Sequence, residues 1–257
     1  MTAVDTQTIH RVMHEIKRRR LEVLRVVDLT PRMRRITVGG PELAGFVSLG
    51  TDDHVKLLFP QNAEQTAALE TMVLGGKNEG PMPEMRDYTP RRYDLETLEL
   101  DIDFVLHGDG PASTWAAQAQ PGQFLHIAGP RGSMVVPDIF DSYLLIGDET
   151  ALPAIARRLE GLAANRRALV VVEIENGAEQ QVLDSPAEVE VIWVLREGGK
   201  DHLLTTVQQL VLPEGQLYAW IATEAKASRQ IRRVLLDDKG LDQQFVKAVG
   251  YWQLDPH

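Results

Sequence analysis

The sequence contains no cysteine among its 257 residues. This absence excludes disulfide bonds, iron–sulfur clusters, thiolate zinc sites and dithiol redox chemistry. If the protein moves electrons, an organic cofactor must carry them.

Long apolar runs and an excess of basic charge are also missing. No apolar run reaches the roughly 18 residues of a membrane-spanning helix, and the first residues lack the apolar stretch of a secretory signal. We therefore expect a cytoplasmic protein without a membrane span. Acidic residues outnumber basic ones by 37 to 27, which argues against general nucleic-acid binding. The basic cluster from Arg11 to Arg25 is interpreted as a solvated N-terminal helix, because no aromatic residues interleave with it.

The first half of the chain has the pattern of an antiparallel β-barrel. Apolar and polar side chains alternate from Leu98 to Leu106, as in a strand with one face buried. Similar short segments are separated by turns rich in Gly and Pro, which is typical of closed barrels. Further strands are expected at residues 21–27, 34–38, 54–59 and 123–128, and a long surface loop at 61–85.

The hydrophobic period changes near Asp141. Continuous apolar runs at residues 143–146 and 168–174 are typical of strands buried on both faces of a parallel sheet. They alternate with expected helices at 152–162, 203–211 and 224–236. This alternation predicts a doubly wound nucleotide-binding domain, so we expect one domain over residues 1–137 and a second over 138–257.

The most informative motif is the six-residue stretch from Arg86 to Arg91. It supplies a flat aromatic ring, a small hydroxyl and guanidinium groups, which suit the ring, the polar edge and the phosphates of a flavin. His107 follows, and then a Gly-rich turn at residues 108–115 that can present backbone amides to a pyrophosphate. By itself the Arg-x-Tyr-Thr pattern also fits an ordinary surface strand.

The order of several motifs resembles the siderophore-interacting protein family of flavin-dependent ferric-siderophore reductases. The resemblance covers the chain from Arg20 to Trp252 and is carried by DDHVKLLFP, RDYTPRRYD, LDIDFVLHGDGPASTW, LLIGDETALPAIARRLE and AVGYWQL. It implies a ferredoxin reductase-like fold, with an FAD-binding barrel after the N-terminal helix. It also implies an NAD(P)H-binding domain whose C-terminal tail returns to the flavin.

The resemblance also implies the residues that bind FAD. Asp103 and His107, four residues apart and expected on one face of a strand, are assigned to the flavin wall rather than to a catalytic dyad or a metal site. The full set is Arg86, Asp87, Tyr88, Thr89, Asp103, His107, Gly110, Pro111, Ala112, Ser113, Thr114, Trp115 and Trp252. For Trp252 the alternative is a frayed tail.

A nucleotide site is expected at residues 145–153, where a strand, a turn and a helix follow one another. The pattern G-x-G-x-x-G is absent, so a plain turn capped by Asp148 or Thr150 is an equal alternative. The resemblance assigns NAD(P)H to Gly147, Asp148, Glu149, Thr150, Ala151, Thr223, Glu224, Arg229 and Arg233. Its members usually carry Gly where Thr223 stands, and the arginines also fit a solvated helix face.

Lys56 and Arg131 are the candidate substrate residues. Both lie beside segments that are expected to surround the flavin site. Basic residues around a site on an acidic protein can hold an anionic substrate. A ferric tris-catecholate is such a substrate. Lys56 also fits an ordinary lysine at a strand edge.

The resemblance therefore implies a cytoplasmic ferric-chelate reductase that acts on an anionic, catecholate-type ferric siderophore, and we favour a monomer. NADPH or NADH would pass a hydride to FAD, and single electrons would then reduce chelated Fe(III) to Fe(II), with no metal held by the protein. Two alternatives are a general flavin or quinone reductase and a siderophore-binding flavoprotein without useful turnover.

Overall fold

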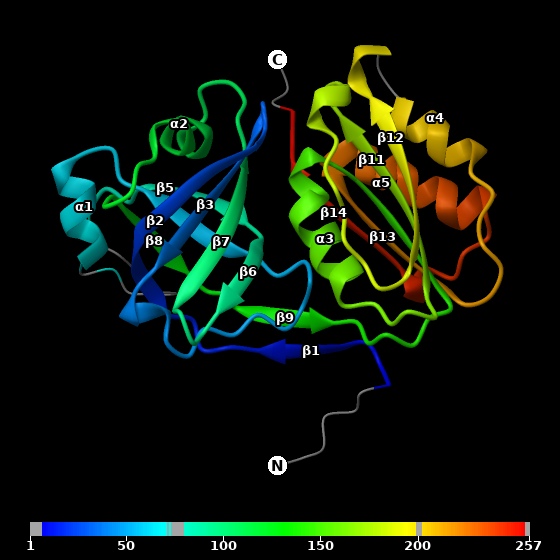
Figure 1. Ribbon diagram of the computed structural model, residues 1–257, viewed down its shortest axis with the longest axis horizontal. Helices are drawn as coiled ribbons and strands as arrows, with labels where there is room; N and C mark the ends of the chain where they lie inside the picture. The colour runs from blue at the N-terminus through cyan, green and yellow to red at the C-terminus, as the bar shows by residue number, and fades with distance from the viewer. Residues whose placement is uncertain (1–6, 71, 73–79, 199–201, 255–257) are drawn as a thin grey trace. The chain divides into compact units, whose positions relative to one another are not determined.

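The computed structural model describes residues 7–70, 72, 80–198 and 202–254, and it divides into two compact units. The first unit runs to Pro137 and the second begins at Asp138 (Figure 1). None of the described helices is long and apolar enough to cross a membrane.

The first unit is built on a curled antiparallel sheet of seven strands in the order β5-β4-β8-β2-β3-β7-β6. Its two edge strands, β5 and β6, follow one another in the chain through Thr89, so the sheet curls back on itself. The strands are β2 (Arg18–Thr30), β3 (Met33–Gly39), β4 (Val55–Phe59), β5 (Glu84–Tyr88), β6 (Pro90–Asp94), β7 (Glu99–Val105) and β8 (Phe124–Ala128). The predicted antiparallel barrel is confirmed. A separate two-stranded sheet pairs β1 (His10–Met13) with β9 (Gly132–Val135).

The predicted N-terminal helix is wrong, because its residues form β1 and the start of β2. In β2 the side chains of Arg19, Leu21 and Val23 are buried, while Arg18 and Arg20 on the other face are not. The strand therefore has the alternation of period two that a half-buried strand requires. Three consecutive arginines hide this alternation, since one of them points inward.

The core of the first unit lies inside the curled sheet. It contains Leu21, Ile36, Ile102 and Phe104 from the strands, together with Ala116 from helix α2 (Pro111–Gln118). The predicted loop at residues 61–85 is wrong in part, because α1 (Ala63–Glu70) forms within it and β5 begins at Glu84. Residues 71 and 73–79 of that prediction lie outside the described residues.

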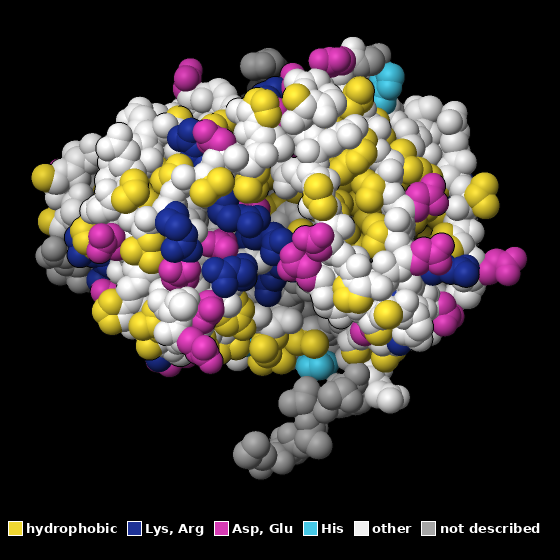
Figure 2. Space-filling model, in the orientation of Figure 1, with side chains coloured by type: hydrophobic (Ala, Val, Ile, Leu, Met, Phe, Trp, Pro, Cys, Tyr) yellow, Lys and Arg dark blue, Asp and Glu magenta, His cyan; other side chains and the backbone are white. Residues whose placement is uncertain are grey.

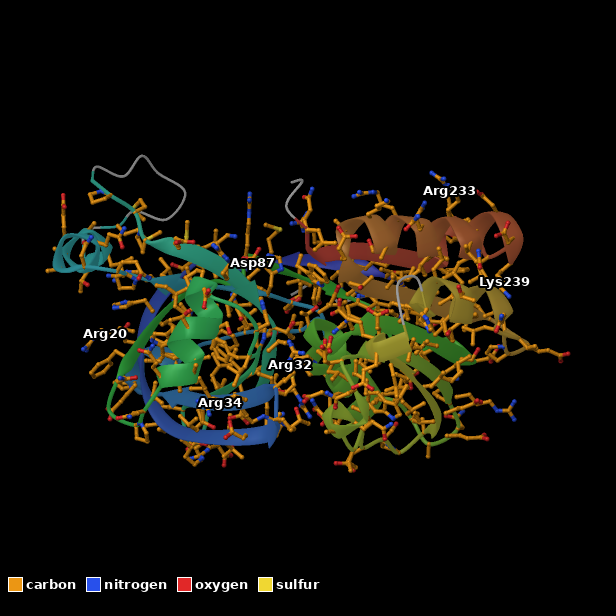
Figure 3. The ribbon with its side chains drawn as sticks, turned by 90° about the horizontal axis from the view of Figure 1, so that it is seen from above. Arg20, Arg32, Arg34, Asp87, Arg233 and Lys239 are labelled. Carbon is orange, nitrogen blue, oxygen red and sulfur yellow. The ribbon has the colours of Figure 1, made fainter. Side chains whose placement is uncertain are left out.

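The second unit is a parallel sheet of five strands in the order β12-β11-β10-β13-β14, and it confirms the predicted doubly wound domain. Helix α3 covers one face and α5 the other (Figures 1 and 3). The strands are β10 (Ser142–Asp148), β11 (Arg167–Ile174), β12 (Glu188–Leu195), β13 (Leu217–Glu224) and β14 (Val246–Trp252); the helices are α3 (Leu152–Glu160), α4 (His202–Gln209) and α5 (Ala225–Arg233). The single-turn helices of both units are η1 (Pro41–Leu43), η2 (Glu149–Ala151), η3 (Gly177–Glu179), η4 (Arg196–Gly198) and η6 (Gln243–Phe245), and η5 (Val234–Asp238) is a π-helical turn.

This strand order places the ligand-binding edge of the sheet. The chain moves outward from β10 to β11 and β12, and then crosses to β13 and β14 on the other side. Ligands of open α/β sheets bind outside the carboxyl ends of the strands, at the point where the order reverses. That point lies between the ends of β10 and β13.

Candidate functional site

The motif at residues 86–89 lies on β5 and runs into Thr89. The side chain of Arg86 is 47% exposed, and its guanidinium contacts Glu84 at 2.8 Å. The Tyr88 ring packs against Phe104 with 4.5 Å between centroids, and burial raises the pKa of the Tyr88 hydroxyl. Thr89 is buried. The motif thus combines the Tyr88 ring, which Phe104 holds in place, with the exposed guanidinium of Arg86. The ion-pair partner of Arg86, Glu84, is also exposed.

Helix α2 begins at an open turn. Gly108 has a φ of 50°, and Gly110 precedes the helix without any side chain capping its first amides. A Cβ atom on either glycine would meet nothing within 4 Å, so this side of the turn is open. The backbone N–H of His107 donates to Ser113 Oγ at 2.8 Å, which fixes the turn from inside. The amides at the start of α2 are therefore free to bind an anion.

A cavity of about 430 Å³ lies beside the start of α2. Trp115 forms part of its wall and packs against Phe59 and Phe104, at 5.9 and 5.7 Å between centroids. The cavity has the size of a ligand pocket. Its lining residues are Leu58, Phe59, Pro60, Gln61, Glu84, Asp109, Pro111, Thr114, Trp115, Gln118 and Phe124. The first unit thus offers an aromatic ring, an exposed guanidinium, uncapped helix amides and a cavity, which suit an FAD, but neither Arg86 nor Tyr88 lines this cavity.

The structure does not pair Asp103 with His107 on one face of a strand, because β7 ends at Val105. Asp103 is buried and accepts two hydrogen bonds from the Arg35 guanidinium, at 2.7 and 2.8 Å. His107 lies in the following turn and is exposed. Figure 2 shows Lys and Arg side chains gathered over β3, β6 and β7 with Asp and Glu among them, in agreement with the Arg35–Asp103 and Arg92–Asp101 ion pairs.

The two candidate substrate cations differ in their surroundings. Lys56 Nζ lies 2.8 Å from Asp87 Oδ1, and both side chains are 51% exposed. Arg131 is exposed in the turn before β9, and its guanidinium has no ion pair among the described residues. Arg19 supports this turn by donating to the carbonyl oxygen of Gly129 at 3.2 Å. Of the two cations, Arg131 has the charge more available to an anion.

In the second unit the first strand ends in a tight turn. A Cβ atom on Gly147 would clash with Ala151 Cβ and with the carbonyl oxygen of Ala222. Glycine at this position therefore lets η2 and α3 start close to the sheet. Asp148 caps η2 by accepting a hydrogen bond from the Thr150 amide at 2.9 Å. The capped-turn alternative is correct as a description of the local structure.

Asp148 joins several of the predicted site residues. It is 1% exposed, and it accepts hydrogen bonds from Thr150 Oγ1 at 2.5 Å, from Thr223 Oγ1 at 2.8 Å and from Trp252 Nε1 at 2.7 Å. Burial raises the pKa of the Asp148 carboxyl, although these donors act in the opposite direction. Trp252 is thus part of strand β14 rather than of a frayed tail.

Sequence reasoning missed Arg196 at the same edge. Its guanidinium contacts Glu149 at 2.8 Å, Glu175 at 2.9 Å and Glu173 at 3.3 Å. These partners keep the Arg196 side chain charged, and its pKa is raised despite burial. The signal was available, since Arg196 directly follows a parallel strand whose carboxyl end should reach the ligand edge.

Of the two predicted arginines of α5, Arg233 does not lie at this edge. Arg229 and Arg233 line a separate cavity of about 300 Å³ on the helix with Arg232, Leu236 and Asp237. Arg233 is nine residues beyond Glu224, so it lies about 13 Å along the helix axis from its start. It points away from the sheet (Figure 3). Glu224 itself caps α5 by accepting from the amides of Lys226 and Ala227.

Two family models match this chain. The siderophore-interacting FAD-binding domain matches residues 22–134, and the siderophore-interacting protein model matches residues 140–255. The NADPH-dependent ferric-chelate reductase of Escherichia coli (strain K12) is 38% identical over 94% of this chain and 95% of its own. The ferric vibriobactin reductase of Vibrio cholerae is 30% identical over 91% and 89%. The crystal structure of a siderophore utilization protein from T. fusca is 40% identical and superimposes with a TM-score of 0.85 over 96% of this chain and 98% of that chain.

Proposed function

The chain belongs to the siderophore-interacting protein family, and on this premise we propose that it passes electrons from NADPH or NADH through FAD to iron held in a siderophore. It is an FAD flavoprotein and an NAD(P)H-dependent ferric-chelate oxidoreductase. The observation that carries the proposal is the presence in one unit of the Tyr88 ring, the exposed Arg86 and the uncapped amides of α2.

In the first unit we assign the cofactor by chemistry. Arg86 leaves Glu84 to pair with a phosphate, the amides of Ala112 and Ser113 receive the pyrophosphate, and Tyr88 stacks on the ring system. Phe104 fixes the Tyr88 ring from behind. When bound, FAD supplies the chemistry that links a two-electron donor to a one-electron acceptor.

In the second unit the donor nucleotide is assigned to the carboxyl edge between β10 and β13. Gly147 brings the turn close to the sheet. Arg196 is surrounded by three carboxylates, so we assign it to holding Glu149, Glu173 and Glu175 in place at this edge rather than to binding a phosphate.

The substrate is proposed to be an anionic ferric catecholate that meets Arg131 first and Lys56 second. Fe(III) prefers hard oxygen ligands more strongly than Fe(II) does, so reduction weakens the chelate and releases the iron. A cytoplasmic location and a monomeric state complete the proposal.

Three measurements on the purified protein test this function. We expect a flavin absorbance spectrum, its bleaching by NADPH under anaerobic conditions, and the appearance of Fe(II) trapped by a ferrous chelator after a ferric tris-catecholate is added. A flavin that stays oxidised with both NADPH and NADH would identify a siderophore-binding flavoprotein. Rapid turnover of a quinone without release of Fe(II) would identify a general quinone reductase. Either result would overturn the proposal.

A further inference from the structure

We propose that the first unit has a further binding site, in which the buried Arg19 and the neighbouring Lys17 hold a small monocarboxylate with an apolar stem. The site is a cavity of about 240 Å³ beside Gly129 and Pro130, in the turn that carries Arg131. It uses no residue of the flavin motif or of the nucleotide edge. The inference does not depend on the proposed function, because it concerns binding by residues of the first unit alone.

Arg19 is a buried cation without an ion-pair partner among the described residues. Its side chain is 4% exposed, and Nη1 donates to the carbonyl oxygens of Lys17 and Gly129 at 3.3 and 3.2 Å. Nε is buried and has no hydrogen-bond partner in the same part of the chain. Burial lowers the pKa of Arg19, although Glu42 and Glu15 act in the opposite direction. A buried guanidinium without a counter-charge is costly, and a bound anion would offset that cost.

The surroundings of Arg19 fix its position without neutralising it. Arg19 Cζ lies 5.3 Å from the centroid of the buried Phe46 ring, so the attraction between cation and ring replaces part of the lost hydration. The backbone N–H of Gly129 donates to the carbonyl oxygen of Lys17 at 3.1 Å, which ties the turn to the segment before β2. None of these contacts supplies a negative charge. The cation is therefore held in place before a ligand binds, which lowers the entropic cost of binding.

The charges of the cavity wall match a ligand with one negative charge. Its cations are Arg19 and Lys17 and its carboxylate is Glu15, so the wall carries one positive charge when histidine is counted as neutral. Glu15 is 78% exposed and lies 3.1 Å from Lys17, so solvent competes for this pair. A monocarboxylate would neutralise the wall. A phosphate dianion would leave one negative charge uncompensated.

The apolar part of the wall indicates a hydrocarbon stem on the ligand. Met13 and Val47 line the cavity and are 55% and 38% exposed, so an apolar group that covers them removes apolar surface from water. Pockets for drug-sized ligands have roughly 300–1,000 Å³, and this smaller cavity suits a ligand of a few carbon atoms. Such a carboxylate is either a free molecule or a group carried by the ferric chelate, and the chemistry of recognition is the same for both.

The experiment uses butyrate as the probe and butyramide as its neutral counterpart of similar shape. Calorimetric titration of the FAD-saturated protein measures both, at constant ionic strength because salt screens the charges. Arg19→Gln removes the buried charge and keeps an N–H donor. Lys17→Gln and Glu15→Gln remove charges of opposite sign from one ion pair at the cavity. Arg18→Gln, on the other face of β2, is the matched control.

We expect a Kd for butyrate of roughly 1–10 mM, in keeping with one charge-assisted hydrogen bond and a short apolar stem. Butyramide should bind at least about tenfold more weakly, and Arg19→Gln should raise the Kd for butyrate by a similar factor. Lys17→Gln should raise this Kd and Glu15→Gln should lower it, each by roughly two- to fivefold, because both groups are exposed. Arg18→Gln should leave it unchanged.

A second measurement identifies the source of the carboxylate. Ferric citrate is a chelate that bears carboxylates, and butyrate is added to its reduction by the FAD-saturated protein with NADPH. Competitive inhibition would support a site for a carboxylate of the chelate. Reduction without competition would support a site for a free carboxylate.

Three results would overturn the inference. Butyramide binding as tightly as butyrate would show that the cavity does not select charge, and tighter binding of phosphate would assign it to another class of anion. An unchanged Kd in a folded Arg19→Gln variant would mean that Arg19 only supports the turn at Gly129. If Arg19→Gln does not fold, Lys17→Gln and Glu15→Gln decide, because equal Kd values in these two variants would overturn the inference. A protein that binds butyrate as expected but reduces no ferric chelate would overturn the proposed function and leave this inference standing.

Discussion

Lys56 and Asp87 lie opposite each other in the β4–β5 ladder, and Lys56 Nζ is 2.8 Å from Asp87 Oδ1. One residue is the candidate substrate cation and the other belongs to the flavin motif between Arg86 and Tyr88. The carboxylate therefore reduces the positive charge that Lys56 can offer to an anionic substrate. Because both side chains are 51% exposed, the pair is weak and solvent competes for it.

Asp87→Asn should lower the KM for an anionic ferric tris-catecholate. The substitution removes the partner of Lys56, and exposed pairs of this kind are worth about 0.2–1 kcal/mol, so we expect an improvement of up to about fivefold. Steady-state kinetics with an uncharged ferric hydroxamate provide the control. A similar improvement with the uncharged chelate would contradict the electrostatic explanation.

Replacing both Lys56 and Arg131 by Ala should raise the KM for the anionic chelate several-fold, with little effect on flavin reduction by NADPH. The two cations would stabilise bound substrate only, so uniform binding is lost. Added salt should weaken the unmodified protein more than the double variant, because screening acts on charges that the variant lacks. Arg131→Ala alone should have the larger effect, since Lys56 is already paired. Equal salt slopes would exclude these cations from the substrate site.

Arg86→Ala should lose FAD while the fold is kept. A charge-assisted hydrogen bond to phosphate is worth about 1.5–3 kcal/mol, so the Kd for FAD should rise by roughly one to two orders of magnitude. Glu84→Gln should act in the opposite direction, because it removes the present partner of Arg86. Arg167→Ala, at another exposed ion pair, is the control. FAD titration followed by flavin fluorescence measures all three variants, and full occupancy in Arg86→Ala at low micromolar protein would refute the assignment.

Asp148→Asn should change how stability depends on pH. Burial raises the pKa of Asp148 in the folded protein above its unfolded value, so its contribution is fully present below the unfolded pKa and is lost as pH rises through the folded pKa. The difference in free energy of unfolding between the unmodified protein and Asp148→Asn should therefore decrease as pH rises above about 4, by at most about 1.4 kcal/mol per pH unit. Urea unfolding across this range measures it. A difference that grows with pH would mean that the charged form is favoured in the folded state.

Gly147→Ala should destabilise the second unit by about 1–3 kcal/mol, as overpacking in a tight core does. The added Cβ would clash with Ala151 Cβ and the carbonyl oxygen of Ala222. Gly177→Ala is the matched control, because a Cβ there would meet nothing within 4 Å. Thermal unfolding of the two variants decides the point, and similar melting temperatures would show that the turn can relax.

Local patterns in the sequence determined most of the architecture. The alternation from Leu98 to Leu106 predicted β7, and the apolar runs at 143–146 and 168–174 predicted β10 and β11. The positions of these strands are confirmed because apolar residues on the core-facing side mark each element. The half-buried character expected of β7 is wrong, since Asp101 and Asp103 on its polar face are buried in ion pairs with Arg92 and Arg35. The pattern failed to predict the start of β2, because Arg18, Arg19 and Arg20 are consecutive cations and only Arg19 is buried.

The candidate site depended on contacts that no local pattern contains. Trp252 reaches Asp148 across 104 residues of sequence, and Arg196 reaches Glu149 across 47. The order of the parallel strands decides both contacts, because it brings the carboxyl ends of distant strands to one edge. The helix axis likewise decides that Arg233 lies away from that edge, although it is close to Glu224 in the sequence. Residue types and their spacing thus determined the chemistry available to this protein, and only the packing of the strands decided which of those residues meet.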